Sequence, residues 1–379
     1  MNSTVKEVYC FKCKMSFDFN DNLFYCPNCG YSLDIKYDYK KIKEIISNDR
    51  HFKTHLISHW KYWPFYPLHD FKKKVSLGEG CTPLIQSSHS KNLMLKFEAC
   101  NPTGSFKDRG SAIEVSRARE LKARKLVCAT TGNMGASIAF YANKAVIPAV
   151  IFVPSFTPKT KLEQIKASGA RIVKVKGNYD KALKKSIVFA KKHNCYLTGD
   201  YPLRGEGQKS VGFEICDQLN WSVPENIVLP IGNGTLCFAV FKAFQELKLV
   251  GLTNRMPKVI GVQSSECMPV TRSFERKSKE IILSRKEEKA GTIATAINCN
   301  LPVDGLEALF ALRESKGFGL SVTDKQVLGA RKLLAEKEGL FAEPSGAVSF
   351  AGYLKVKRKL KGKTVCVVTG HGLKQLTIS

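Results

Sequence analysis

The chain has 379 residues, 44% of them hydrophobic, and a formal net charge of +27. This length predicts two or three domains, and the apolar content is that of a globular protein with sizeable cores. No apolar run approaches the roughly 20 residues that span a bilayer, and the first residues lack the apolar core of a signal peptide. We therefore expect a cytoplasmic protein without a membrane partner.

The excess of basic residues has two interpretations. Clustered Lys and Arg side chains neutralise phosphates, so a nucleic-acid partner is one of them. The lysines are instead spread along the whole chain, from Lys40 to Lys363, and form no compact block with interleaved aromatic residues. We favour a solvated basic surface with affinity for small anionic ligands, and we expect no nucleic-acid partner.

Two C-x-x-C pairs lie near the N-terminus, Cys10 with Cys13 and Cys26 with Cys29. Each pair can place two thiolates on one turn, and four thiolates complete the tetrahedral site that zinc prefers. Residues 1–36 are too few to bury a core of their own, so a structural metal is physically sensible there. Chance spacing, redox pairs and a metal-free ribbon are the alternatives. The other nine cysteines are scattered and indicate free buried thiols.

From residue 76 onward, short apolar runs alternate with longer segments of helical spacing. Strands that alternate with helices predict parallel sheets with helices on both faces, and ligands bind beyond the carboxyl ends of such strands. The predicted strands are 93–97, 126–129, 150–153, 172–175, 227–231, 259–262 and 365–368, and the predicted helices include 159–168, 180–193 and 238–247.

Lys107 lies in the stretch 101–110, Asn-Pro-Thr-Gly-Ser-Phe-Lys-Asp-Arg-Gly, between the predicted strand 93–97 and a helix-like segment. A lysine at such a turn can act as a nucleophile, and its amine can form a Schiff base with an aldehyde if burial lowers its pKa. A lone lysine in a Gly-rich turn is more often a solvated surface residue. This interpretation of Lys107 therefore requires that the other residues of a binding site are present elsewhere in the chain.

Three further motifs follow predicted strands. Residues 130–137 combine small side chains with Asn133, so a helix N-terminus there can approach an anion. Residues 231–236, Ile-Gly-Asn-Gly-Thr-Leu, can form a phosphate cradle of backbone N–H groups, although the dinucleotide spacing G-x-G-x-x-G is absent. Residues 369–374, Thr-Gly-His-Gly-Leu-Lys, close the last strand. Taken singly, each motif is also compatible with an ordinary turn.

Together and in this order, these motifs resemble those of the threonine synthases, pyridoxal-phosphate enzymes of fold type II, the β-family. The resemblance covers nearly the whole chain, including the N-terminal cysteines and the segment 75–84, in which the family more often has Asn at the position of Cys81. It implies an α/β fold like that of the tryptophan synthase β chain, with two open parallel-sheet subdomains. The expected boundaries are a zinc ribbon at 1–36, a linker at 37–75 and a catalytic domain at 76–379, with a smaller subdomain at about 97–221.

The resemblance also implies roles for individual residues. Lys107 would carry the pyridoxal phosphate and act as the base, Asn133 would bond the ring oxygen, and Thr369 would donate to the pyridine nitrogen. The family more often has Gly and Asn at the positions of Thr235 and Leu236, and we expect His371 to be structural. The remaining expected contacts are the cofactor-phosphate cradle of Gly232, Asn233, Gly234, Thr235 and Leu236, and the substrate-binding residues Thr131, Arg204 and Lys209.

The implied reaction is the conversion of O-phospho-L-homoserine and water to L-threonine and phosphate. Another β-family lyase is an alternative, such as a threonine or serine dehydratase or a phosphoserine-dependent cysteate synthase. An alternative from another class is a basic zinc-ribbon nucleic-acid-binding protein that has kept an inactive enzyme fold. Fold relatives are often dimers, so a homodimer is compatible with this interpretation. The intact Lys107, Asn133 and Thr369 favour the enzyme, which acts on a small phosphorylated amino acid.

Overall fold

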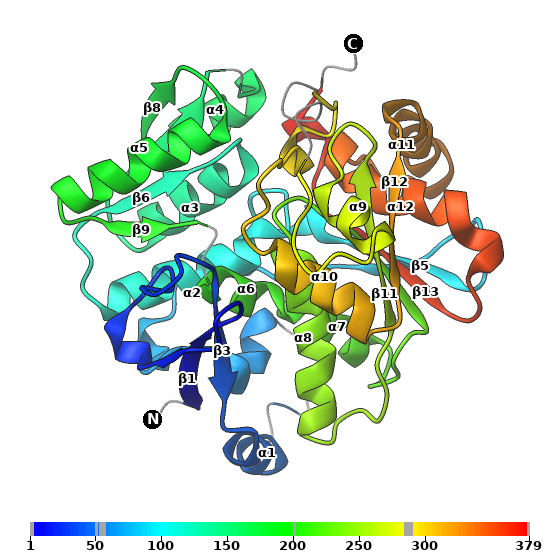
Figure 1. Cartoon of the computed structure of the whole chain (residues 1–379), viewed down its shortest axis with the longest axis horizontal. Helices are drawn as coiled ribbons and strands as arrows, with labels where there is room; N and C mark the ends of the chain where they lie inside the picture. The colour runs from blue at the N-terminus through cyan, green and yellow to red at the C-terminus, as the bar shows by residue number, and fades with distance from the viewer. Residues whose placement is uncertain are drawn as a thin grey trace.

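Three sheets organise the computed structural model, which describes residues 4–49, 52, 58–155, 157–199, 202–283 and 291–376. A small N-terminal sheet lies beside a four-stranded sheet and a six-stranded sheet, each of which is flanked by helices (Figure 1). Parallel pairing dominates both larger sheets, which confirms the predicted fold class.

The N-terminal sheet is antiparallel, with the order β2-β1-β3. Its strands are β1 (Val5–Cys10), β2 (Ser16–Phe17) and β3 (Leu33–Tyr37). After β3, helix α1 (Tyr39–Asn48) begins at Asp38, whose side chain accepts from two backbone N–H groups of the first turn. The 3-10 helices η3 (His59–Phe65) and η4 (Phe71–Lys73) then lead into the larger sheets.

The four-stranded sheet is entirely parallel and has the order β8-β7-β6-β9. Helix α5 packs on β6 and β7, and α3 packs against α2 and α4 (Figure 1). The strands are β6 (Leu126–Ala129), β7 (Ala149–Pro154), β8 (Arg171–Val175) and β9 (Tyr196–Thr198). The helices are α2 (Lys107–Glu120), α3 (Asn133–Lys144), α4 (Lys159–Ala167) and α5 (Tyr179–Lys192).

The six-stranded sheet has the order β12-β11-β10-β13-β5-β4, and only the edge strand β4 is antiparallel. The last strand in the chain therefore pairs with one of the first, since Val365 lies opposite Met94. The strands are β4 (Leu84–Gln86), β5 (Leu93–Phe97), β10 (Asn226–Pro230), β11 (Lys258–Ser264), β12 (Phe318–Val322) and β13 (Thr364–Val368).

Helices cover both faces of the six-stranded sheet. Helix α12 packs on β10, β11 and β13 and is itself covered by α11, whereas α8 and α10 pack on each other and contact β11. The helices are α6 (Pro202–Gln208), α7 (Ser210–Gln218), α8 (Thr235–Leu249), α9 (Pro269–Glu275), α10 (Gly305–Glu314), α11 (Asp324–Glu338) and α12 (Pro344–Val356). Short 3-10 turns are η1 (Phe19–Asp21), η5 (Glu98–Cys100), η6 (Thr295–Ile297), η7 (Lys357–Lys359) and η8 (Gly372–Lys374).

The N-terminal sheet shares the main hydrophobic core with the rest of the chain. Val8 and Ile35 belong to the same buried cluster as Ile113 and Phe213. Burial of apolar surface stabilises such contacts by about 25 cal/mol per Å². The N-terminal sheet is therefore packed into the molecule, so its position can affect the larger sheets.

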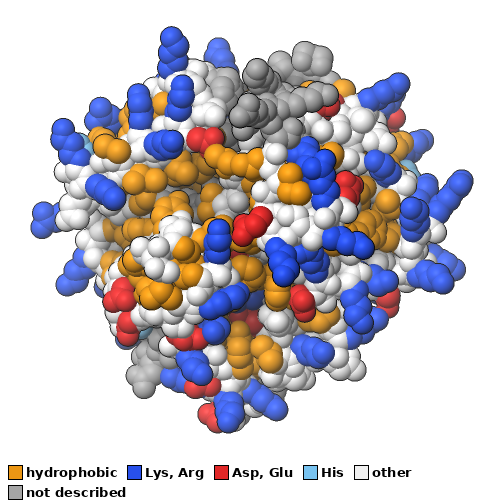
Figure 2. Space-filling view, viewed as in Figure 1, with side chains coloured by type: hydrophobic (Ala, Val, Ile, Leu, Met, Phe, Trp, Pro, Cys, Tyr) orange, Lys and Arg blue, Asp and Glu red, His pale blue; other side chains and the backbone are white. Residues whose placement is uncertain are grey.

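Basic side chains are spread over the visible face of the molecule, among hydrophobic and acidic ones (Figure 2). Figure 2 shows Lys and Arg side chains scattered across this face and around its rim, with no single block that contains most of them. Among the described residues, no helix combines the length and the apolar character that crossing a bilayer requires.

Candidate active site

A cleft with about 880 Å³ of empty space, part of it open to solvent, is lined by residues that follow strands of both larger sheets. The loops that follow β5, β6, β10 and β13 all contribute residues to it. Of the predicted cofactor and substrate residues, ten line the cleft: Lys107, Thr131, Asn133, Arg204, Gly232, Asn233, Gly234, Thr235, Leu236 and Thr369. Lys209 does not line it.

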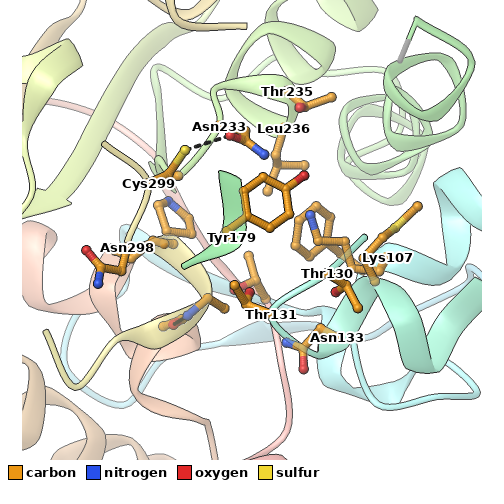
Figure 3. Close-up of a pocket in the computed structure, with 18 of the residues that line it drawn as sticks. Lys107, Thr130, Thr131, Asn133, Tyr179, Asn233, Thr235, Leu236, Asn298 and Cys299 are labelled. Carbon is orange, nitrogen blue, oxygen red and sulfur yellow. Dashed lines mark hydrogen bonds between the residues drawn. The ribbon is translucent and has the colours of Figure 1, made fainter. Parts of the chain in front are cut away.

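Lys107 is the first residue of α2, and its side chain points into the cleft (Figure 3). The pKa of its amine is lowered to about 7, first by burial and then by the positive charge of Arg204. A large fraction of the amine is therefore neutral near neutral pH. A neutral buried amine is the form that attacks an aldehyde.

Asp108 fixes the turn that carries Lys107. Its carboxylate accepts from the Thr103 backbone N–H at 2.6 Å, from Thr103 Oγ1 at 2.5 Å and from Ser137 Oγ at 2.6 Å. Thr103 lies in the loop before α2, and Ser137 lies in α3, so one buried carboxylate ties the lysine turn to the helix that begins at Asn133. This linkage explains why an Asp follows the lysine in the sequence.

Glycines let α6 approach α2 closely enough to bring Arg204 beside Lys107. A Cβ on Gly110 would lie 2.4 Å from Arg204 Cγ, and a Cβ on Gly207 would lie 2.1 Å from the Arg109 carbonyl oxygen. Neither position can hold a larger residue without displacing a helix. Arg204 is only 2% exposed, and its Nη2 donates to Thr235 Oγ1 at 3.3 Å.

The N-terminus of α3 faces the cleft next to Lys107. Gly132 precedes the helix with a φ of 140°, which only glycine adopts readily, and a Cβ there would lie 2.2 Å from Lys161 Cδ. Free N–H groups at such a helix start bind anions. Asn133 Nδ2 donates to Glu343 Oε1 at 2.5 Å. Among the described residues, the buried Asn133 Oδ1 has no hydrogen-bond partner.

The loop 231–234 leads from β10 to the N-terminus of α8. Gly234 has a φ of 101°, and a Cβ there would lie 2.2 Å from the Asp304 carbonyl oxygen. The helix start at Thr235 directs backbone N–H groups at the cleft, as a phosphate cradle requires. The Thr235 hydroxyl donates to Asp304 Oδ2 at 2.5 Å. Its proton is therefore engaged with a carboxylate, and the backbone is the donor that remains for a phosphate.

Lys209 lies away from the cleft, in contrast to its expected role in substrate binding. Its ammonium is fully buried and donates to the Phe65 carbonyl oxygen at 3.0 Å and to Glu246 Oε2 at 2.8 Å. It also forms an ion pair with Glu206 at 2.6 Å. Its three donors are directed at protein groups, so this geometry gives Lys209 a structural role.

The segment after β13 contributes Thr369, which is 4% exposed and lines the cleft. His371 is the N-cap of η8, where its Nδ1 accepts from the Leu373 backbone N–H at 3.1 Å. It does not line the cleft. The expected structural role of His371 agrees with this position.

Tyr179, Cys299 and Glu343 are among the cleft residues to which the sequence pattern gave no role. Tyr179 begins α5, and its ring lies between the Lys107 side and the Cys299 side of the cleft (Figure 3). Cys299 donates to Asn233 Oδ1 at 2.7 Å. Glu343 forms an ion pair with Lys161 at 3.2 Å, in addition to its contact with Asn133. Tyr179 follows the carboxyl end of a strand, β8, which is the signal that could have identified it.

The cleft fits pyridoxal phosphate on three independent observations. A buried lysine with a lowered pKa can bond the aldehyde. Gly232 and Gly234 let the loop pack against the backbone of Ile297 and Asp304, and the helix start that follows them is suited to a phosphate. The buried amide of Asn133, which lines the same cleft, has an oxygen without a partner among the described residues.

A second candidate site lies in the N-terminal sheet. The thiol sulfurs of Cys10, Cys13, Cys26 and Cys29 all lie within 4.8 Å of one another. Cys10 Sγ is 3.4 Å from Cys29 Sγ, and Cys13 Sγ is 3.5 Å from Cys26 Sγ. None of the thirteen cysteines, all of which lie in the described part of the chain, forms a disulfide. The two predicted pairs therefore meet in one cluster of four candidate metal ligands.

Comparisons with known proteins agree with this geometry. The family described as pyridoxal-phosphate dependent enzymes matches residues 75–370. The threonine synthase of Methanocaldococcus jannaschii is 40% identical over 96% of this chain and 92% of its own length. That of Methanosarcina acetivorans is 38% identical over 96% of this chain and 91% of its own length.

Solved structures share the fold at lower identity. The processed form of threonine deaminase isoform 2 from Solanum lycopersicum superposes with a TM-score of 0.64 and 23% identity, over 76% of this chain and 83% of its own. Maize serine racemase gives a TM-score of 0.66 and 22% identity, over 77% and 88%. These two likenesses concern the fold alone. The similarity over almost the full length to the first two relatives, together with the cleft around Lys107, shows that the chain belongs to the threonine synthases, within the pyridoxal-phosphate-dependent enzymes.

Proposed function

We propose that the chain converts O-phospho-L-homoserine and water to L-threonine and phosphate in the cleft around Lys107. Membership of the family supports the reaction, and the lowered pKa of Lys107 supports the site. The substrate class is a small phosphorylated amino acid, whose two anionic ends need separate partners.

The cofactor is held by residues from four loops. Lys107 would bond its aldehyde carbon, Asn133 would bond its ring oxygen, and Thr369 would donate to its pyridine nitrogen. The loop from Gly232 to Leu236 binds its phosphate through backbone N–H groups. When bound, pyridoxal phosphate supplies an electron sink that stabilises negative charge next to the substrate amino group.

Lys107 performs the proton transfers. Once the substrate amine has replaced Lys107 on the cofactor, the freed lysine amine, with a pKa of about 7, can take the proton from the substrate α-carbon and return protons to neighbouring carbons. A general base is most effective when its pKa lies near the working pH. Arg204 helps to hold the pKa low, and Asp108 keeps the lysine turn against α3.

The two anionic ends of the substrate bind on opposite sides of Lys107. Thr131 and the N–H groups that begin α3 bind the carboxylate, because a helix N-terminus favours negative charge. Arg204 binds the leaving phosphate, since its planar guanidinium matches phosphate geometry. Lys209 is not part of this group, because its ammonium is engaged with Glu246 and Glu206.

The observation that carries the proposal is the buried guanidinium of Arg204 in the same cleft as Lys107. A dehydratase acting on threonine or serine has no substrate phosphate and does not need this second cation. We expect Arg204→Gln to lower kcat/KM for O-phospho-L-homoserine by about 10- to 100-fold, because a charge-assisted contact contributes about 1.5–3 kcal/mol. Arg204→Lys keeps the charge without the fork and serves as the matched variant.

Steady-state kinetics with inorganic phosphate as a competitor tests this assignment. Phosphate should compete with the substrate in the wild type and more weakly in Arg204→Gln. Equal kcat/KM in the wild type and Arg204→Gln would contradict the role of Arg204. Formation of keto-acid from threonine without phosphate release would instead place the chain among the dehydratases.

We further propose that Cys10, Cys13, Cys26 and Cys29 bind one structural zinc ion. Four thiolates in a compact cluster match the preference of zinc, and they leave no open position for catalysis. We expect about one zinc per chain in the wild type and none in Cys29→Ser, measured by elemental analysis. Cys100→Ser is the control, because Cys100 is also exposed but lies outside the cluster. Full zinc content in Cys29→Ser would contradict the proposal.

A further inference from the structure

A continuous set of buried hydrogen bonds connects the N-terminal sheet to the phosphate cradle. Ser32 Oγ donates to Asp304 Oδ1 at 2.7 Å, and Thr235 Oγ1 donates to Asp304 Oδ2 at 2.5 Å. Ser32, Thr235 and Asp304 are 4%, 7% and 7% exposed. One carboxylate therefore accepts from the N-terminal sheet on one oxygen and from the first residue of α8 on the other.

Asp304 also contacts the cradle through its backbone. Its N–H donates to the Asn233 carbonyl oxygen at 2.9 Å, and its carbonyl oxygen occupies the space beside Gly234. Asp304 directly precedes α10, but its side chain makes no capping bond to that helix. The carboxylate is directed at Ser32 and Thr235 instead. A shift of Asp304 would therefore move the loop that faces the cofactor phosphate.

Ser32 is tied closely to the second cysteine pair. Cys26 donates its backbone N–H to the Tyr31 carbonyl oxygen at 2.9 Å, and Gly30 donates to the Cys26 carbonyl oxygen at 2.8 Å. Only Gly30 and Tyr31 separate Cys29 from Ser32 in the chain. The position of Ser32 thus depends on the turn that Cys26 and Cys29 form, and a metal ion bound by these thiolates would fix that turn.

We propose that Ser32 and Asp304 are positioning residues for the cofactor phosphate, and that the N-terminal cysteine site and the cofactor site are coupled through them. The proposal rests on the proposed cradle at residues 232–236. A buried carboxylate that loses one donor is left with an unpaired oxygen, so it reorients toward other donors. Because Asp304 holds Thr235 and Asn233, that reorientation disturbs the cradle. Coupling between two sites is reciprocal, so bound cofactor also favours the metal-bound turn.

The test measures the dissociation constant of pyridoxal phosphate for the full chain after its cofactor has been removed. Visible absorbance of the bound cofactor gives the affinity, and the ³¹P resonance of its phosphate reports the cradle. We expect Ser32→Ala to weaken binding by about 10-fold, the scale of one hydrogen bond to a charged group, and to shift the ³¹P resonance. Ser32→Thr keeps the hydroxyl and should bind within about 2-fold of the wild type.

Tyr31→Phe is the matched control, because it removes a neighbouring contact between the same two parts of the chain. Tyr31 Oη donates to Glu307 Oε2 at 3.0 Å and accepts from the Leu306 N–H at 3.1 Å, without contacting Asp304. It should leave the cofactor affinity and the ³¹P resonance unchanged. Equal losses of cofactor affinity in Tyr31→Phe and Ser32→Ala would overturn the proposal. They would show that any weakened packing of the N-terminal sheet lowers the affinity, without a specific role for Ser32 and Asp304.

A second arm tests the coupling to the metal. Removing the metal from the wild type with a chelator should weaken cofactor binding by about the same factor as Ser32→Ala does. In Ser32→Ala itself, metal removal should weaken cofactor binding by less than about a further 2-fold, because the effects of coupled sites are non-additive. Thr235→Val removes the other end of the chain of hydrogen bonds and provides the same comparison if Ser32→Ala does not fold. Wild-type affinity and an unchanged ³¹P resonance in Ser32→Ala would overturn the proposal. A wild type that binds no pyridoxal phosphate would instead refute the cradle itself.

Discussion

At the scale of single residues, the reactivity of Lys107 depends on the charges around it. Arg204 lowers its pKa, whereas Glu114, Cys128 and Glu343 raise it, and burial is the largest effect. The balance leaves the pKa at about 7, far below the usual value of a lysine. The neighbours of Lys107 therefore prepare the amine for reaction before any cofactor arrives.

The first prediction concerns the pH dependence of cofactor capture by the cofactor-free protein. Only the neutral amine attacks an aldehyde, so a lowered pKa extends reactivity to lower pH. We expect the rate of cofactor capture to rise between about pH 6 and 8, with a midpoint near 7, and then to level off. The visible absorbance of the bound cofactor measures this rate.

Lysine acetylated on its α-nitrogen is the reference in solution for this measurement, because the rate at which its side-chain amine reacts should continue to rise toward pH 10. Arg204→Gln removes a positive charge from the neighbourhood of Lys107 and should move the midpoint to higher pH. A midpoint near 10 in the wild type would show that the amine is not buried as described.

At the residue scale, the sequence indicates candidate site residues where a site needs a local pattern. Thr369 directly follows β13, Asn133 begins α3 shortly after β6, and Lys107 begins α2 after β5 and η5, so one short segment of sequence contains each motif. Lys209 could not be assigned in the same way. Its partners Glu246 and Phe65 are 37 and 144 residues away, and only the folded chain brings them together.

At the scale of elements, helix N-termini shape the cleft. Helices α2, α3 and α8 all begin at its edge, with Lys107, Asn133 and Thr235 as their first residues. Each helix starts just beyond a loop that follows a strand, which is the usual place for a ligand in a parallel sheet. The phosphate and the carboxylate can therefore both bind to backbone N–H groups.

The second prediction is that Gly234→Ala weakens cofactor binding by about 10- to 100-fold, because the left-handed backbone and the Asp304 carbonyl oxygen both oppose a Cβ. The measurement is a titration with pyridoxal phosphate followed by absorbance. Gly329→Ala is the control, since Gly329 lies in α11 and a Cβ there meets no atom within 4 Å. Unchanged affinity in Gly234→Ala would exclude the loop 231–234 as the cradle.

The sequence predicted strands better than their arrangement. Strands 93–97 and 126–129 were predicted at their observed bounds, because each is an apolar run that ends where polar or turn residues begin. Strand β12 was not predicted, since Gly319 and Ser321 interrupt its apolar pattern. The strand order was also beyond local prediction, because β13 inserts between β10 and β5 across most of the chain.

At the scale of the whole molecule, buried charges connect the N-terminal sheet to the catalytic core. Lys242 pairs with Asp34 of β3 and with Glu206 of α6, and Lys209 pairs with Glu206 and Glu246. Breaking one member of such a buried network is costly, because the partner charges remain out of water. The N-terminal sheet is thus held in place by this network as well as by the apolar core.

The third prediction follows from this network. Lys209→Met should lower the free energy of unfolding by about 3–5 kcal/mol, the usual loss when a buried ion pair is broken, while KM for the phosphorylated substrate changes little. Urea unfolding and steady-state kinetics measure the two effects. Lys332→Met is the control, because that side chain is 71% exposed. A large rise in KM without a loss of stability would show that Lys209 binds the substrate instead.

The proposed reaction is tested most directly by one assay. Purified protein with bound pyridoxal phosphate is given O-phospho-L-homoserine, and the two products, phosphate and threonine, are then quantified together. We predict equal amounts of phosphate and threonine from the wild type. We expect neither product above background from Lys107→Ala, because that variant lacks both the attachment point and the base. Phosphate and threonine formed at the wild-type rate by Lys107→Ala, or no threonine from the wild type, would contradict the account.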